Sequence, residues 1–299
     1  MGYVWTAEQI ESYESYYREV SFHFSGVAIE FATTDDFVRS VLPPCLQPTD
    51  TPSGLVSITQ GRESWQGAFT IADEESIGAI YLNATRDGQE GLYSLTVIVD
   101  GDMNVTTGRE SWGMPKKRGE SNIFSDGERL YAYSERRGTR LIEIDATLGE
   151  GSQPYVEQGR LYELKGWIAP DGSGLHDDPY LVVFDTQTSY SEVRQAEGSL
   201  RLTGTLEDPV GDIPVVSIDH TTFLAGVETF VFAEEVQLEE RDTFKPFIYG
   251  RAYDNWTERI KRTTDTFAAP RGHGAADPSR APTRDRPRPA HQGASHPSE

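Results

Sequence analysis

Apolar and polar residues alternate in short runs along most of the chain, and Gly, Asp or Glu residues separate the runs. A period of two residues is typical of β-strands that bury one face. The pattern therefore predicts a mainly β protein with a few flanking helices, in which one antiparallel meander closes on itself. The predicted strands are 22–31, 55–58, 68–71, 77–82, 92–99, 122–124, 129–134, 139–147, 160–168, 179–185, 199–206, 214–222 and 225–236.

Helical periodicity is confined to a few segments. Thr6 and Gln9 have the spacing of a capping box at the start of the first one. Residues 33–36, Thr-Thr-Asp-Asp, are types that cap helices, and they precede the second. The predicted helices are 6–19, a short one through 37–41, 253–261 and, as an alternative to strand, 221–225.

Two local patterns predict turns. The pentapeptide Gly-Arg-Glu-Ser-Trp occurs at residues 61–65 and again at 108–112. Five residues are too few to establish a structural repeat, so we expect either coincidence or parallel use of the two copies at two turns. Residues 135–138, Glu-Arg-Arg-Gly, are typical of the tip of a hairpin.

The chain of 299 residues is long enough for one large domain, which we expect at 1–265. Residues 266–299 are rich in Pro, Arg and Ala and nearly lack large apolar side chains, which predicts a disordered tail. No apolar run is long enough to span a bilayer, and the first residues do not resemble a signal peptide, so we expect a cytoplasmic protein. Cys45 is the single cysteine, and no Cys/His spacing typical of a metal site occurs.

The formal net charge is -21. Such a surface repels nucleic acid and anionic membranes, so neither is an expected partner. It also repels an anionic small molecule, which would need a local positive island. The residues that could form one are Arg109, Lys116, Lys117 and Arg118.

Residues 108–120 have a composition that indicates a chemical role. Pro115 holds the backbone in a defined bend before Lys116 and Lys117. A lysine amine is nucleophilic only when it is neutral, and an ordinary pKa of ~10.4 leaves roughly one molecule in a few thousand neutral at pH 7. In an extended segment the two lysines point to opposite faces, so burial should lower the pKa of Lys116 more than repulsion by Lys117 does.

These residues resemble the acetoacetate decarboxylase family, in which Gly-Arg-Glu and then Pro-Lys-Lys carry a Schiff-base lysine. Residues 171–173 (Asp-Gly-Ser) and 208–215 (Asp-Pro-Val-Gly-Asp-Ile-Pro-Val) resemble later segments of that family. The resemblance spans roughly residues 20 to 240. It implies a β-barrel-like domain, a homo-oligomer and a keto acid as the small-molecule partner, with no metal or organic cofactor.

By this resemblance Lys116 is the Schiff-base lysine and Lys117 its basic neighbour. Glu110 is the carboxylate best tied to the motif, either as a catalytic group or as an ion-pair partner of Arg109. Arg109 would bind the substrate, and Trp112 and Met114 would line its pocket or pack the core.

The sequence departs from the family at two positions. The first-strand arginine of the decarboxylases falls near Phe24 or Ser25, and a glutamate after the second hairpin falls near Ile71. Asp73, Glu74 or Glu75 could replace that glutamate after a small shift, or they could form only a solvated loop.

Three functions follow as hypotheses. The first is decarboxylation of a β-keto acid through an iminium on Lys116. The second is Schiff-base aldolase, dehydratase or hydratase chemistry on a 2-keto acid, and the third is a binding protein without turnover. Both enzyme hypotheses require Lys116 to be buried in a cavity.

Overall fold

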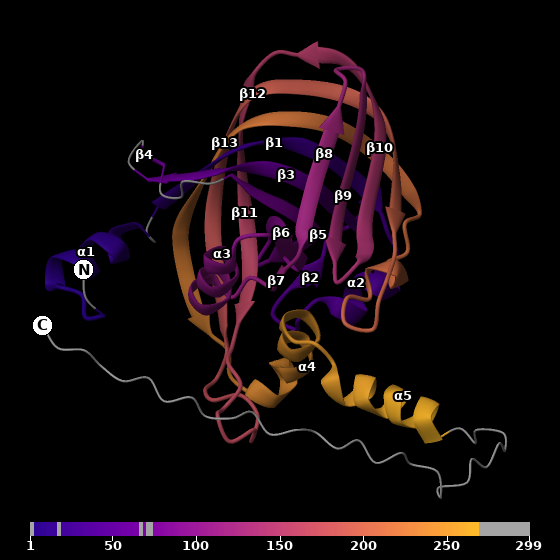
Figure 1. Cartoon of the computed structure of the whole chain (residues 1–299). Helices are drawn as coiled ribbons and strands as arrows, with labels where there is room; N and C mark the ends of the chain where they lie inside the picture. Colours follow the sequence, from indigo (N-terminus) through magenta and orange to yellow (C-terminus); the bar gives the residue numbers. More distant parts are fainter. Residues whose placement is uncertain (1–2, 17–18, 66–67, 70–73, 269–299) are drawn as a thin grey trace, which may run out of the picture. The chain divides into compact units, whose positions relative to one another are not determined.

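The computed structural model describes residues 3–16, 19–65, 68–69 and 74–268 (Figure 1). The chain divides into one unit that ends at Trp256 and a second that begins at Thr257. Of the predicted tail 266–299, residues 266–268 belong to the last helix, and residues 269–299 lie outside the described residues. The helices are α1 (Ala7–Tyr16), α2 (Asp35–Val41), α3 (Asp102–Thr107), α4 (Arg241–Ala252) and α5 (Trp256–Ala268), with a π-helical turn η1 (Gly108–Trp112) and a 3-10 turn η2 (Val210–Asp212).

The strands form one large sheet that closes on itself. They are β1 (Glu19–Ala32), β2 (Gln47–Pro48), β3 (Ser53–Trp65), β4 (Ala68–Phe69), β5 (Glu75–Arg86), β6 (Gln89–Val99), β7 (Lys116–Arg118), β8 (Glu120–Ser125), β9 (Arg129–Arg136), β10 (Thr139–Ser152), β11 (Tyr155–Lys165), β12 (Tyr180–Leu202) and β13 (Ser217–Gln237). Within the described residues, seven of them form a barrel in the order β11-β6-β5-β3-β1-β13-β12, and β12 pairs back with β11.

A second layer covers one side of the barrel. Strands β10, β9 and β8 continue the sheet from β12, and β8 contacts β3 and β5. Figure 1 shows this layer in front of the barrel strands. The approach is close at Gly78 in β5, where a Cβ atom would lie 2.3 Å from the Ser134 hydroxyl oxygen in β9. A larger residue at position 78 would push the two layers apart.

Alternation along the strands separates the hydrophobic core from a cavity. In β1, Ile29 and Phe31 are fully buried in the core between the two layers, whereas Phe22 and Phe24 line the barrel interior. In β3, Val56 belongs to the core, and its neighbours on either side line the cavity. The barrel interior is therefore a hollow, and in β1 and β3 alternate residues separate its wall from the core.

The structure confirms the mainly β fold class and several local predictions. Thr6 and Gln9 form the expected capping box, with each side chain accepting a hydrogen bond from the other backbone N–H. Thr34 caps α2 by accepting from the Phe37 N–H. The hairpin between β9 and β10 turns at Arg137 and Gly138, both with positive φ.

Other predictions were wrong. Residues 221–225 are strand, because β13 runs unbroken from Ser217 to Gln237 and pairs with both β1 and β12. The sheet is not a simple meander, since β6 pairs in parallel with β7 and β11. The first Gly-Arg-Glu-Ser-Trp copy lies inside β3 and the second in η1, so the two share no structure. Helix α4 was not predicted. No described helix has both the length and the apolar character needed to cross a bilayer.

Candidate active site

The connection from β6 to β7 brings the lysine pair to the barrel. Helix α3 leads into η1, which ends at Gly113 in the left-handed region with φ 79°. A Cβ at this position would also lie 2.6 Å from Lys165 Cβ, so only glycine fits. The Met114 N–H donates to the Gly108 carbonyl, and the chain then extends through Pro115 into β7.

Strand β7 places its two lysines on opposite faces, as the alternation predicts. Lys116 pairs in register with Val97 and lines the barrel cavity, which has a volume of about 780 Å³. Its side chain is only 7% exposed. Lys117 pairs with Ile98, whose side chain lies in the core, and it does not line the cavity. The two amines therefore have different surroundings.

Burial lowers the pKa of Lys116, and nearby carboxylates, Glu63 first, oppose the shift. The Lys116 Nζ donates to Asn104 Oδ1. The other side of the same amide donates to Glu75 Oε2 and, at 3.3 Å, to Glu63 Oε1. Asn104 thus links the amine to two carboxylates and fixes the direction of the lysine side chain.

The two carboxylates differ in environment. Glu75 is 6% exposed, and burial raises its pKa, while the hydrogen bond from Asn104 and the charge of Lys116 oppose the rise. Glu63 is half-buried and lines the cavity. A raised pKa brings a carboxyl group closer to the range that a general acid needs.

A third buried carboxyl group lies behind the lysine. Glu163 is fully buried, and burial raises its pKa to about 7 against the opposing charge of Arg251. It accepts a hydrogen bond from the Ser94 hydroxyl and lies 3.7 Å from the Arg251 guanidinium. Its charge also acts on Lys116.

Lys117 belongs to a buried network of ion pairs. Its Nζ donates to Asp208 Oδ1 at 2.9 Å and to the Glu207 carbonyl at 2.7 Å. Arg136 donates to the other Asp208 oxygen at 2.7 Å and to Asp254 at 3.1 Å. Asp208 begins one of the two segments that resembled the family, and its contacts give that segment a structural role: it holds β7 in place.

The other predicted site residues lie in two places. Trp112 and Met114 line the cavity beside Lys116, and the Trp112 ring centroid lies 4.6 Å from that of Phe184. Arg109 and Glu110 instead line a separate, smaller pocket, where Glu110 is exposed. The expected positive island does not form around Lys116, because Arg118 pairs with Asp102 and Lys117 with Asp208.

The cavity wall is acidic instead. The glutamates that line it are Glu30, Glu63, Glu90, Glu157 and Glu228, against Lys116 and Arg160. Arg160 is paired with Asp185 at 2.7 Å. Burial raises the pKa of Glu228 to about 7. Phe24, near which the family arginine was expected, also lines the cavity and brings no charge.

Sequence reasoning missed Asn104 and Glu63. Asn104 lies in an unremarkable polar stretch, and its contacts with Glu63 and Glu75 join residues 41 and 29 positions apart. Glu75 was considered only as one of three acidic residues close in sequence. Asp73, another of the three, lies outside the described residues, and so does Ile71. Within the described part of the chain, no group of three or more His, Cys, Asp or Glu side chains is arranged to hold a metal ion.

Gly108 leaves space for the Lys116 side chain, and this gives a first prediction. A Cβ at residue 108 would lie 2.5 Å from Lys116 Cδ and 3.1 Å from Nζ. Gly108→Ala should therefore displace the amine and slow imine formation with a keto acid by about 100-fold, since ångström-scale misplacement has effects of that size. Single-turnover borohydride trapping measures the rate.

Gly250→Ala is the matched control, because a Cβ at Gly250 in α4 would contact nothing within 4 Å. Thermal unfolding of both variants should remain close to that of the wild type. An unchanged trapping rate in Gly108→Ala would contradict the prediction.

Comparisons with known proteins support the family resemblance of the lysine motif. The family model described as acetoacetate decarboxylase (ADC) matches residues 9–237. Comparison with curated protein sequences found no match. The solved structures that resemble the chain include acetoacetate decarboxylase from Legionella pneumophila, with 15% identity and a TM-score of 0.63 over 74% of this chain and 87% of that chain.

Two other enzymes are similar in fold. The enduracididine biosynthesis enzyme MppR, complexed with the condensation product of pyruvate and imidazole 4-carboxaldehyde, has 17% identity and a TM-score of 0.62, covering 73% of this chain and 89% of its own. An acetoacetate decarboxylase-like enzyme from Sphingomonas wittichii RW1 has 13% identity and a TM-score of 0.59, covering 74% and 92%. Because the family model spans well over half of the sequence, the chain belongs to the acetoacetate decarboxylase family.

Proposed function

We propose that the protein is an enzyme that forms a Schiff base between Lys116 and a keto acid, and then makes or breaks a carbon–carbon bond. One observation carries this proposal: Lys116 is buried at the wall of a large cavity, and burial lowers its pKa. A neutral amine in contact with a substrate cavity is the requirement for imine formation. A protein that only binds small molecules has no need for it.

The reaction begins with addition of the neutral Lys116 amine to the carbonyl carbon. The carbonyl oxygen gains two protons, one from the amine nitrogen and one from an acid, and leaves as water, which gives a protonated imine. Glu75 is suited to act as that acid because its pKa is raised and because Asn104 links it to the amine. We therefore assign proton transfer to Glu75 and Glu63, rather than to Glu110 in the smaller pocket.

The protonated imine accepts electrons from a neighbouring bond. In decarboxylation of a β-keto acid, the electron pair of the bond to the carboxylate moves towards the imine nitrogen, and carbon dioxide leaves. The resulting enamine takes up a proton on carbon, and hydrolysis releases the ketone and the free lysine.

Condensation of a 2-keto acid with an aldehyde is the second candidate. Here the imine loses a proton from the adjacent carbon, and the enamine attacks the aldehyde carbon to form a new carbon–carbon bond. The cavity volume of about 780 Å³ favours this candidate, because a small β-keto acid does not need so much space. The condensation product bound to MppR supports it by analogy of fold.

Borohydride trapping tests the proposal. The protein is incubated with acetoacetate or with pyruvate, sodium borohydride is added, and the adduct is measured by intact mass and peptide mapping. We expect a stable secondary amine on Lys116. With acetoacetate, the adduct mass shows whether carbon dioxide has left before reduction.

Lys117 is the internal control, because its amine is held by Asp208 and the Glu207 carbonyl and should remain unlabelled. Absence of any Lys116 adduct across a wide panel of keto acids, in protein shown to be folded, would overturn the enzyme proposal and favour a binding protein. Adding an aldehyde after pyruvate separates the two candidates, since only the condensing enzyme forms a heavier product.

A further inference from the structure

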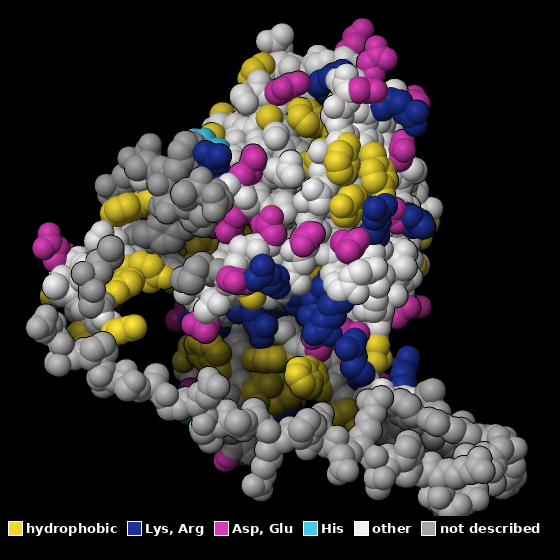
Figure 2. Space-filling view, viewed as in Figure 1, with side chains coloured by type: hydrophobic (Ala, Val, Ile, Leu, Met, Phe, Trp, Pro, Cys, Tyr) yellow, Lys and Arg dark blue, Asp and Glu magenta, His cyan; other side chains and the backbone are white. Residues whose placement is uncertain are grey.

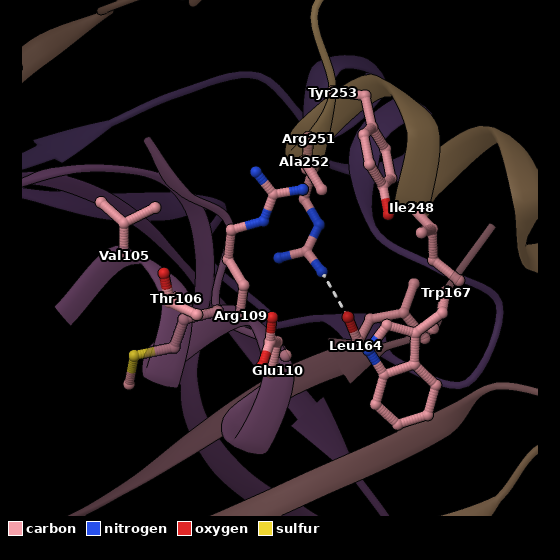
Figure 3. Close-up of a pocket in the computed structure, with 13 residues that line it drawn as sticks. Val105, Thr106, Arg109, Glu110, Leu164, Trp167, Ile248, Arg251, Ala252 and Tyr253 are labelled. Atoms are coloured by element: carbon pink, nitrogen blue, oxygen red, sulfur yellow. Dashed lines mark hydrogen bonds between the residues drawn. The ribbon is translucent and has the colours of Figure 1, made fainter. Parts of the chain in front are cut away.

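The smaller pocket contains two arginines that the chemistry at Lys116 does not use. It has a volume of about 260 Å³ and lies between the α3–η1 segment, the end of β11 and helix α4. Figure 3 shows the side chains of Arg109 and Arg251 reaching into it. Two guanidinium groups in one small pocket are unusual in a chain with a formal net charge of -21.

Arg109 is held in place without a carboxylate. Its guanidinium lies over the Tyr253 ring, 4.9 Å from the ring centroid, and among the described residues no carboxylate forms an ion pair with it. Stacking on an aromatic face leaves the in-plane N–H groups of an arginine free to donate. The stacked arginine is therefore oriented for a ligand that accepts hydrogen bonds.

Arg251 is fixed more firmly. Its side chain is buried, its two terminal nitrogens donate to the Ser94 and Leu164 carbonyls, and its Nε has no hydrogen-bond partner in the described structure. Glu163 is the carboxylate beside it, at 3.7 Å. Arg251 thus contributes positive charge beside the pocket, which its side chain lines.

The rest of the pocket sets the size and type of ligand. Trp167, Ile248 and Leu164 give it apolar walls, and Glu110 lies exposed among its lining residues. Met114 contributes to this pocket and to the large cavity, whereas Lys116 and Asn104 line only the large cavity. The pocket is therefore separate from the amine.

We propose that this pocket is a second binding site, for a small aliphatic carboxylate, in which Arg109 and Arg251 hold the anion and Trp167 packs against its carbon chain. Planar guanidinium groups match the two oxygens of a carboxylate, and the volume suits a molecule of a few carbon atoms. The site does not depend on imine formation at Lys116.

Arginine modification tests this site. Phenylglyoxal is applied to wild type and to Lys116→Met, with pyruvate or with acetone, which is neutral and of similar size, and modified peptides are quantified. Pyruvate should slow modification of Arg109 at least fivefold in both proteins, and acetone should not. Arg129, whose side chain is 71% exposed, is the internal reference and should react at the same rate throughout.

Three results would overturn the proposal: equal protection by acetone, equal protection of Arg129, or protection that disappears in Lys116→Met. The last would mean that the carboxylate binds at the lysine. Calorimetry of pyruvate binding to Lys116→Met gives a second measurement. An added Arg109→Gln substitution should weaken binding at least tenfold, and an added Arg129→Gln substitution should not.

Discussion

Lys116→Met is expected to abolish keto-acid trapping and to leave the fold intact. Methionine is similar in length to lysine and fills the same apolar space, but it has no amine to form the imine. Removal of a covalent nucleophile should lower turnover on the order of 10⁴-fold or more. The substitution removes a buried amine together with its hydrogen bond to Asn104. Because burying a charged amine is costly, the free energy of unfolding at pH 7 should not fall.

The pH dependence of stability checks the same feature. Burial lowers the pKa of Lys116 in the folded protein, while the unfolded chain keeps a value near ~10.4. Between these two values the unfolded chain binds more protons, so the stability of the wild type rises with pH. Lys116→Met lacks this contribution.

The difference in unfolding free energy between Lys116→Met and wild type should therefore shift in favour of the wild type as pH rises towards 10. Urea titrations at several pH values measure it, and taking the difference removes the contributions of other groups. A difference that does not change with pH would mean that Lys116 has an ordinary pKa. In that case the amine would be charged at neutral pH, and the Schiff-base proposal would lose its basis.

Asp208→Leu is expected to have the largest effect on stability. Asp208 is 3% exposed and pairs with Lys117 at 2.9 Å and with Arg136 at 2.7 Å. Removing it leaves two buried cations without this partner, which should cost about 3–5 kcal/mol of unfolding free energy. Chemical denaturation measures the loss.

Asp145→Leu is the matched control, because Asp145 forms an exposed ion pair with Arg129 at 3.6 Å. Its loss should cost less than about 1 kcal/mol. Combining Asp208→Leu with Lys117→Met removes one of the two cations that lost Asp208 as a partner, and it should recover part of the stability. Equal, small costs for Asp208→Leu and Asp145→Leu would show that the buried network does not hold β7.

Much of the β fold could be predicted because several strands alternate, as in residues 129–134 of β9, where every second residue is buried. The long strand β12 was predicted as two strands because its middle, residues 186–198, is mostly polar. Strand β13 was predicted as two strands because residues 221–225 were also considered as a helix. Helix α4 was missed because it contains Pro246 and Gly250, two poor helix formers. Packing of Phe244 and Ile248 into the core stabilises it instead.

The candidate site was also predicted only in part. The opposite directions of Lys116 and Lys117 follow from strand geometry alone and were predicted. The place of Arg109 and Glu110 was not predictable from their closeness in sequence, because the π-helical turn carries them to another pocket. Asn104 depends on contacts with β3 and the start of β5, which only the closed barrel brings together.

The closure of the barrel also fixes when the lysine site can exist. Strand β1 lies between β3 and β13, and Ser21 pairs with Thr229, 208 positions later. During synthesis on the ribosome, β1 therefore has one unpaired edge until β13 has emerged. Contacts so distant in sequence form slowly, and an unpaired edge is prone to aggregate until they do. Lys116 is made before the midpoint of the chain, yet its cavity is complete only when nearly the whole barrel sequence has left the ribosome.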